Sequence, residues 1–432
     1  MIGATLFVVF VLLMLAGVPI GVALGVGGAL AIGLSNLDTA HWGLLAVPQN
    51  FYASLTKYPL LALPMFVLVG SIFDRSGIAQ RLVNFAVAIL GRGPGMLPVV
   101  AILVAMFLGG ISGSGPANAA AVGGVMILAL ARAGYPAPFS ASVIGAAAAT
   151  DILIPPSIAL IIYSVMVPGA SVPALFAAGM VPGILAGLAL IVPTLWLARK
   201  HKMGQHEAGL PRPLFWTSLR EASWGLFAPV LILGGMRLGW FTPTEAGAVA
   251  VAYGLLVGMF IHRTIQWRDL GAIFREAAEI SGVILLVIGL ASIFAYAVNT
   301  LSIIDPITRA ITNSGLSSTG VLLCLVALLL VVGMFLDGIS IFLIFIPLVM
   351  PLMRTYGWDP VWFGILMTMM VAVGQFTPPM AVNLMVSCKM AGVSMEETFR
   401  WVWWLVLGMM VSLLAVLFMP SLALWLPAYL GY

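Results

Sequence analysis

The chain contains 432 residues, of which 62% are hydrophobic and only 7% are charged. Soluble domains carry about 25% charged residues, so this chain has too few to cover a water-facing surface. Repeated apolar runs of roughly 20 residues predict a polytopic, all-α membrane protein. A β-barrel is disfavoured, because its strands would alternate apolar and polar residues.

In chain order, the first apolar segment, 2–34, is interrupted at "GVPIG" and has neither a basic leader nor a clear cleavage site. We therefore expect a retained transmembrane segment rather than a signal peptide. Several later apolar spans are too short or too broken to be simple crossings. The longest polar stretch, 198–221, divides the chain nearly in half and is expected to be a cytoplasmic linker.

Motifs recur between the two halves. "MFLGGIS" at 106–112 recurs as "MFLDGIS" at 334–340, which pairs Gly109 with Asp337. The segment 152–176 aligns without gaps on 375–399, and the same offset also pairs Gly134 with Gly357. These matches keep the same order, so they predict an internal repeat whose first copy has extra residues after the shared "GIS".

The orientation of the repeats follows from their expected elements. We expect two re-entrant helical hairpins, 96–133 and 319–353, and two crossings broken at proline pairs, 138–167 and 360–390. An odd number of crossings then separates the matched spans that precede them, so the repeats are predicted to be inverted. This arrangement places fourteen of the 18 Lys and Arg residues on one side, which the positive-inside rule assigns to the cytoplasm.

Each proline pair frees backbone carbonyls, because proline lacks the N–H that would bond the carbonyl four residues back. The freed carbonyls belong to Asp151 and Ile152 for Pro155–Pro156, and to Gly374 and Gln375 for Pro378–Pro379. A bare carbonyl in hydrocarbon is costly, and it persists where it lines a cavity or binds a cation. Paired discontinuous helices in inverted repeats are typical of secondary transporters.

Two sodium sites are predicted, each combining a hairpin tip, a proline break and a carboxylate that supply oxygen ligands. The first set is Gly109, Ser112, Ser114, Asp151, Ile154 and Pro156. The second set is Gly333, Asp337, Gly374, Thr377 and Met380, with Met380 contributing its backbone carbonyl.

The hairpin tips also predict an anion site, because a helix N-terminus presents free N–H groups and a positive dipole end. No basic residue lies near either tip or break, so affinity for a carboxylate should depend on bound sodium. The expected substrate contacts are Ser114, Pro116, Asn118, Pro155, Ser157, Gly338, Ser340, Pro378 and Asn383.

Less specific explanations stay open. A proline break can be a simple kink, the glycines and serines of 109–115 can serve close helix packing, and Asp151 or Asp337 can be a structural hydrogen-bonding group. Enzymatic explanations are disfavoured, since no Gly-Lys-Ser/Thr follows the glycines and no complete G-x-S-x-G occurs there. The chain is therefore expected not to be an enzyme.

At these motifs the chain resembles the large membrane subunit of tripartite ATP-independent periplasmic (TRAP) transporters. The resemblance rests on "GGISGSGPANAAAVGGVM", "ILIPPSIALIIYS", "GMFLDGISIFLIFIPLVMPL" and "GQFTPPMAVNLMV", and it covers nearly the whole chain. It implies an elevator-type importer in the bacterial inner membrane, driven by sodium and specific for a small organic acid. It also implies two partners: a soluble periplasmic binding protein and a small four-helix membrane subunit, expected as a separate chain.

The family's sodium positions carry over best to Gly333, Gly374, Thr377 and Met380 in this sequence. Which first-half serine binds sodium is left open by the resemblance. No cofactor other than sodium and no nucleic-acid partner is expected. A stand-alone sodium:anion symporter of related architecture is the alternative, and an ion channel would instead need a continuous pore.

The expected domain organisation follows the repeats. Scaffold helices and interfacial segments occupy 1–95, and central scaffold helices with the linker occupy 174–300. The transport domain combines a hairpin and a broken helix from each half, 96–173 and 301–398. A single C-terminal transmembrane helix is expected over 399–432.

Overall fold

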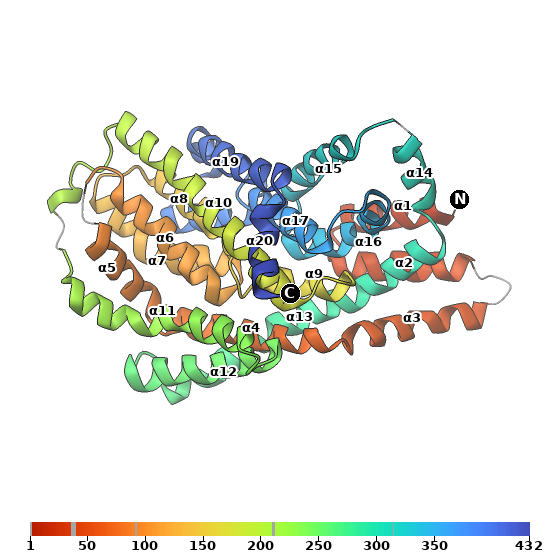
Figure 1. Cartoon of the computed structure of the whole chain (residues 1–432), viewed down its shortest axis with the longest axis horizontal. Coiled ribbons are helices and arrows are strands. Elements are labelled where there is room, and N and C mark those ends of the chain that lie inside the picture. The colour runs from red at the N-terminus through yellow and green to blue at the C-terminus, as the bar shows by residue number, and fades with distance from the viewer. Residues whose placement is uncertain (1, 36–39, 91–92, 210–211, 314) are drawn as a thin grey trace.

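The computed structural model describes residues 2–35, 40–90, 93–209, 212–313 and 315–432, and all regular elements in these ranges are helices (Figure 1). Within these ranges, seven helical segments are long and apolar enough to cross a membrane. They are η2 with α4 (Tyr58–Leu61, Ala62–Arg75), α7 (Gly115–Arg132), α10 (Val172–Lys200), α12 with η4 (Pro243–Leu255, Leu256–Ile261), α13 (Trp267–Thr300), α16 (Gly338–Tyr356) and α19 (Met395–Phe418). The prediction of an all-α, multi-pass membrane protein is confirmed.

The remaining helices do not meet both criteria of length and apolar character, and several of them are the halves of interrupted elements. They are α1 (Ile2–Leu15), α2 (Ile20–Ser35), α3 (Ala40–Leu55), α5 (Ile78–Leu90), α6 (Met96–Ser112), α8 (Ala137–Ala148), α9 (Ile158–Met166), η3 (Glu207–Gly209), α11 (Phe215–Arg237), α14 (Asp305–Asn313), α15 (Ser318–Gly333), α17 (Pro360–Gly374), α18 (Val382–Ala391) and α20 (Ser421–Leu430).

Both predicted helix breaks are present. Pro155–Pro156 separates α8 from α9, Pro378–Pro379 separates α17 from α18, and both X-Pro bonds are cis. At about 1.5 Å per residue, α8 has a length of roughly 18 Å, well short of a hydrocarbon core of about 30 Å. Each pair of short helices therefore forms one discontinuous element.

The helices themselves repeat at one constant spacing along the chain. The spacing that separates the starts of α7 and α16, Gly115 and Gly338, also separates the starts of α10 and α19, Val172 and Met395. It likewise relates Gly134 to Gly357, both of which have a positive φ just after α7 and α16. The repeat therefore extends from the hairpin tips to the helices that follow the breaks.

Gly109 and Asp337, which the motif match pairs, do not occupy equivalent positions in the structure. Gly109 lies in the last turn of α6, where its carbonyl accepts the Gly113 N–H. Asp337 is instead the N-cap of α16, and its carboxylate accepts the Ser340 N–H. The structural counterpart of Asp337 is Ser114, the N-cap of α7, so no insertion separates the two tips.

The two halves interlock through their broken helices. α18 packs against α7 and α8 of the first half, and α9 packs against α16 and α17 of the second. In Figure 1, α6, α7 and α8 lie on the left, α16 lies on the right, and α9 and α17 lie between them. Both hairpins are therefore tied into one core, which α10, α19, α4 and α13 flank.

Several predicted boundaries differ from the helix ends. The expected single helix over 399–432 consists of α19 and α20, because Pro420 has no N–H to continue α19. The boundaries after 173 and 398 fall inside α10 and α19, which begin directly after Ser171 and Ser394. The polar linker occupies 201–214, since α10 extends to Lys200.

The linker is bound to the base of the first hairpin through Glu207, a residue that is only 1% exposed. The Leu97 N–H donates to Glu207 Oε1 at 2.7 Å, and the Tyr135 hydroxyl donates to Oε2 at 2.6 Å. The same hydroxyl accepts the Gly95 N–H. Burial raises the pKa of the Glu207 carboxyl, although these hydrogen bonds oppose the shift.

We expect Glu207→Ala to lower the free energy of unfolding by about 1–3 kcal/mol, because it leaves buried donors without an acceptor. Glu207→Gln retains an oxygen for the Leu97 N–H and should lose less. Since the folded-state pKa is raised, the wild type should lose stability as pH rises through that pKa, and Glu207→Gln should not. Unfolding of the detergent-purified proteins measures both effects; equal stability of the wild type and Glu207→Ala would contradict this role.

Candidate ion and substrate site

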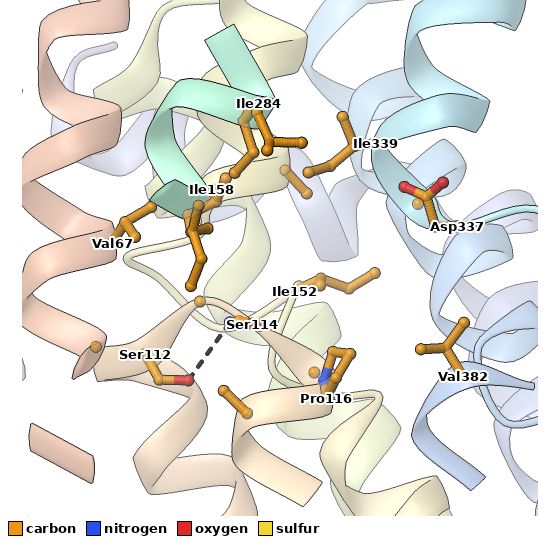
Figure 2. A pocket seen from close by; sticks show the side chains of 18 of the residues that line it. Val67, Ser112, Ser114, Pro116, Ile152, Ile158, Ile284, Asp337, Ile339 and Val382 are labelled. Carbon is orange, nitrogen blue, oxygen red and sulfur yellow. Dashed lines mark hydrogen bonds between the residues drawn. The ribbon is translucent and has the colours of Figure 1, made fainter. Parts of the chain in front are cut away.

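A cavity of about 490 Å³ lies where the hairpin tips meet the helix breaks (Figure 2). Residues 112–117 of the first tip and 337–339 of the second form part of its wall. The breaks contribute Ile152, Ile158 and Gln375, among others, and α4 and α13 close the remaining side. The cavity is thus built from both repeats together with two flanking helices.

The first hairpin tip turns at Gly113, which has φ +62° and ends α6. Pro116 lies in the first turn of α7, as predicted. The tip is pressed against the first break: a Cβ added at Gly110 would lie 3.0 Å from the Pro155 carbonyl oxygen, and one at Gly113 would lie 3.2 Å from that of Pro156. These glycines allow the backbone of the tip to approach the carbonyls of the break.

Asp151 is completely buried beside this tip. A Cβ added at Gly109 would lie 2.7 Å from Asp151 Cα, and the Ser112 hydroxyl lies 3.5 Å from Oδ2. The other carboxylate oxygen, Oδ1, has no hydrogen-bond partner within the described ranges. Because buried polar atoms are normally paired, an unpaired carboxylate oxygen here is a candidate cation ligand.

The other members of the first predicted set lie around the same tip. The Ser114 N–H points to the Ser112 hydroxyl at 3.4 Å, and the Ile154 side chain packs against Gly110 and against Gly183 of α10. The structure therefore brings together the tip and break residues of the first set, Gly109, Ser112, Ser114, Asp151, Ile154 and Pro156.

The second tip and break are in direct backbone contact. A Cβ added at Gly374 would lie 2.6 Å from the Gly333 carbonyl oxygen, and the Met380 N–H donates to the Met334 carbonyl at 3.2 Å. The Thr377 N–H donates to the Gly374 carbonyl at 3.1 Å. Gly333, Gly374, Thr377 and Met380 are thereby brought together.

Asp337, the carboxylate of the second set, serves another local role. It accepts hydrogen bonds from the Ser340 N–H and hydroxyl and so caps α16. It also lines the cavity, across from Ser112 in the view of Figure 2. Its carboxylate is therefore available to the cavity as well as to the helix.

Three of the nine predicted substrate contacts line the cavity: Ser114, Pro116 and Gly338. Ser157 instead closes the first break, since its hydroxyl donates to the Ile152 carbonyl at 2.6 Å. Asn118 ties α7 to α6 by donating to the Ala105 carbonyl at 2.8 Å. The remaining four, Pro155, Ser340, Pro378 and Asn383, are not among the residues that line the cavity.

The Gln375 side chain lines the cavity but was not predicted as a contact, because only its backbone carbonyl was considered. Its Oε1 accepts a hydrogen bond from Asn383 Nδ2 at 3.2 Å. The repeat alignment contained a signal for it, since its counterpart in the first repeat is the apolar Ile152.

The ionisable side chains of the described cavity wall are all acidic. Four carboxylates line it, Asp74, Glu276, Glu279 and Asp337, and no Lys, Arg or His is among its described lining residues. Glu276 forms an ion pair with Arg75 at 2.6 Å, and both side chains are about half exposed. An anion entering this cavity therefore meets carboxyl groups and no basic side chain among the described wall residues.

Known proteins match this sequence over nearly its whole length. The model of the family described as "Tripartite ATP-independent periplasmic transporter, DctM component" matches residues 7–422. The C4-dicarboxylate TRAP transporter large permease protein DctM of Pseudomonas aeruginosa is 37% identical over 413 residues, 95% of this chain and 94% of that protein. Its counterpart in Rhodobacter capsulatus is 33% identical and covers 99% of both chains.

Two further comparisons extend these matches. The isethionate TRAP transporter permease protein DctMQ of Oleidesulfovibrio alaskensis is 34% identical over 97% of this chain, which spans only 65% of that protein. The crystal structure of the Alcanivorax borkumensis YdaH transporter covers 90% of both chains with a TM-score of 0.59 and 14% identity, a likeness of fold alone. The family match and the large-permease relatives confirm the predicted resemblance and a transport rather than an enzymatic role: this chain belongs to the DctM family, the large permeases of TRAP transporters.

Proposed function

We propose that this permease imports a small organic acid across the bacterial inner membrane in symport with sodium. It would receive the substrate from a soluble periplasmic binding protein and act together with a small membrane subunit. The names of its relatives specify C4-dicarboxylates and isethionate, both small organic anions. A cavity of about 490 Å³ is large enough for molecules of this size.

The charge of the cavity wall carries the proposal of cation coupling. Two like unit charges 4 Å apart repel by about 4 kcal/mol at an effective dielectric constant of 20. An organic anion beside Asp337, with no basic residue in the described wall, therefore needs cations bound nearby. The unpaired Oδ1 of Asp151 and the carbonyls gathered at both breaks are hard oxygen ligands of the kind that sodium prefers.

Two sodium sites follow from this chemistry. The first would use Ser112 and Asp151 with carbonyls of the first tip and break, and the second would use Thr377 with carbonyls of Gly333 and Gly374. Because each tip already touches its break, a bound ion would hold both in place and stabilise the adjoining helix N-terminus for the anion.

The same contacts support an elevator mechanism. The hairpins and broken helices would move as one transport domain, since glycine contacts join each tip to its break and α9 and α18 join the two halves. α4 and α13 would belong to the scaffold and line the path. Gly70 of α4 faces the first tip, where an added Cβ would lie 3.1 Å from the Ser112 carbonyl oxygen.

We expect purified permease, reconstituted in proteoliposomes with its small subunit, to take up a radiolabelled organic acid only when a binding protein and an inward sodium gradient are supplied. The sodium gradient provides the driving force that the anion lacks alone. Equal uptake on a proton gradient without sodium would contradict sodium coupling. Uptake without a binding protein would instead support a stand-alone sodium:anion symporter.

Asp151→Asn and Thr377→Ala should each raise the sodium concentration for half-maximal uptake by about tenfold or more, equivalent to about 1.4 kcal/mol of binding free energy. Thr368→Ala is a matched control, because Thr368 makes the same type of hydroxyl-to-carbonyl bond within α17, to Gly364, as Thr377 makes to Val373. Sodium titration of uptake by the four proteins separates these roles. Wild-type sodium dependence in both site variants would count against the assigned ligands.

A further inference from the structure

The two repeats contribute unequal chemistry to the same cavity. Ile152 and Gln375 are repeat counterparts, and both line the cavity. The apolar Leu160 and the polar Asn383 form another pair of counterparts, and both are completely buried. At these two positions the first repeat therefore has aliphatic side chains, and the second has two amide side chains.

The head group of Gln375 lies between the two hairpin tips. A Cβ added at Gly115 would lie 2.9 Å from Gln375 Oε1, and one added at Gly338 would lie 3.0 Å from Nε2. Gly115 and Gly338 are the first residues of α7 and α16 and are themselves repeat counterparts. The positive ends of two helices therefore converge on one amide.

Asn383 fixes the orientation of that amide. Its Nδ2 donates to Gln375 Oε1 at 3.2 Å, and its backbone N–H donates to the Gln375 carbonyl at 3.0 Å. With Oε1 engaged, the donor that remains to Gln375 is Nε2, which faces Gly338 at the start of α16. Asn383 Oδ1 is buried and has no hydrogen-bond partner within the described part of the chain. An amide pair left partly unsatisfied in an apolar protein is expected to complete its bonds with a ligand.

We propose that this amide pair sets the orientation of the substrate in the cavity. Gln375 Nε2 donates a hydrogen bond to an acidic oxygen of the organic anion at the N-terminus of α16, and the rest of the molecule lies toward Ile152 and Ile158. Asn383 is a positioning residue that holds Gln375 in the donor orientation. This inference rests on the proposed function, since it assumes that an organic anion occupies the cavity.

The experiment measures KM for uptake into proteoliposomes that contain the permease and its small subunit, with the binding protein and an inward sodium gradient supplied. Succinate, isethionate and N-acetylneuraminate are tried, and the acid that the wild type transports is used. Gln375→Met keeps the length of the side chain but removes the donor, and Gln375→Glu adds a repelling charge. Each should raise KM by about tenfold or more, the loss expected for a hydrogen bond to a charged group. The sodium concentration for half-maximal uptake at saturating acid should stay unchanged. Thr368→Ala, which changes a buried α17 residue outside the described cavity wall, is the control and should retain the wild-type KM.

The positioning role has its own readout. Asn383→Ala should raise KM in the wild-type background but add little to Gln375→Met, because the two residues act through one hydrogen bond. If Asn383 only supported packing, Asn383→Ala would raise KM by the same factor with or without Gln375→Met, so that the two effects would be additive as free energies. Gln375→Asn, which withdraws the amide by one methylene group, provides a milder variant should the others fold poorly.

The outcomes distinguish the two proposals. Wild-type KM in Gln375→Met, Gln375→Glu and Gln375→Asn, with sodium-dependent uptake intact, would overturn the role of Gln375 and leave the proposed function standing. Raised KM in these variants, together with sodium-independent wild-type uptake, would support the Gln375 contact and overturn sodium coupling.

Discussion

The close contact between hairpin tips and helix breaks is the constraint on which the rest of the structure depends. A chain with 7% charged residues must satisfy the backbone oxygens that its proline pairs release inside an apolar protein. Glycine makes this possible, because a Cβ at Gly374 would collide with the Gly333 backbone and one at Gly109 with Asp151. Carbonyls and a buried carboxylate thereby gather at two places, where their oxygens are available to a cation.

Because the two repeats interlock, both of these tip-and-break contacts lie beside the same cavity. α9 and α18 each pack against the opposite half, so both tips and both breaks face a single cavity. The repeats are alike in backbone but not in side chains at this cavity. Ser114 of the first repeat is the counterpart of Asp337 in the second, and Ile152 is the counterpart of Gln375. A pseudo-symmetric frame therefore encloses an asymmetric cavity.

Much of this could be predicted from the sequence, because the decisive features are local. Apolar spans indicate membrane helices, proline pairs indicate helix breaks, and Pro116 indicates the start of a helix. The offset between the tips was predicted wrongly, because matching letters do not reveal which side of a turn they occupy. "GGIS" ends α6, whereas "DGIS" begins α16. The difference is seen in the hydrogen bond from the Ser340 N–H to Asp337, the N-cap of α16.

Other features depended on contacts between distant segments. Asp74 and Glu279 line the cavity only because α4 and α13 pack beside the tips, which no local pattern indicates. The Gln375 side chain was overlooked because its neighbours Gly374 and Thr377 already explained the break as a source of carbonyl ligands. Its pairing with Asn383 requires the turn between α17 and α18, which brings residues eight positions apart within hydrogen-bond distance.

The most direct test of the central claim is the binding of radiolabelled sodium to the purified permease, measured with and without its organic acid. We predict saturable sodium binding that tightens when the acid is present, because two ligands that favour each other's binding must do so reciprocally. Saturable acid binding that is indifferent to sodium, with no sodium bound at the tips and breaks, would contradict it.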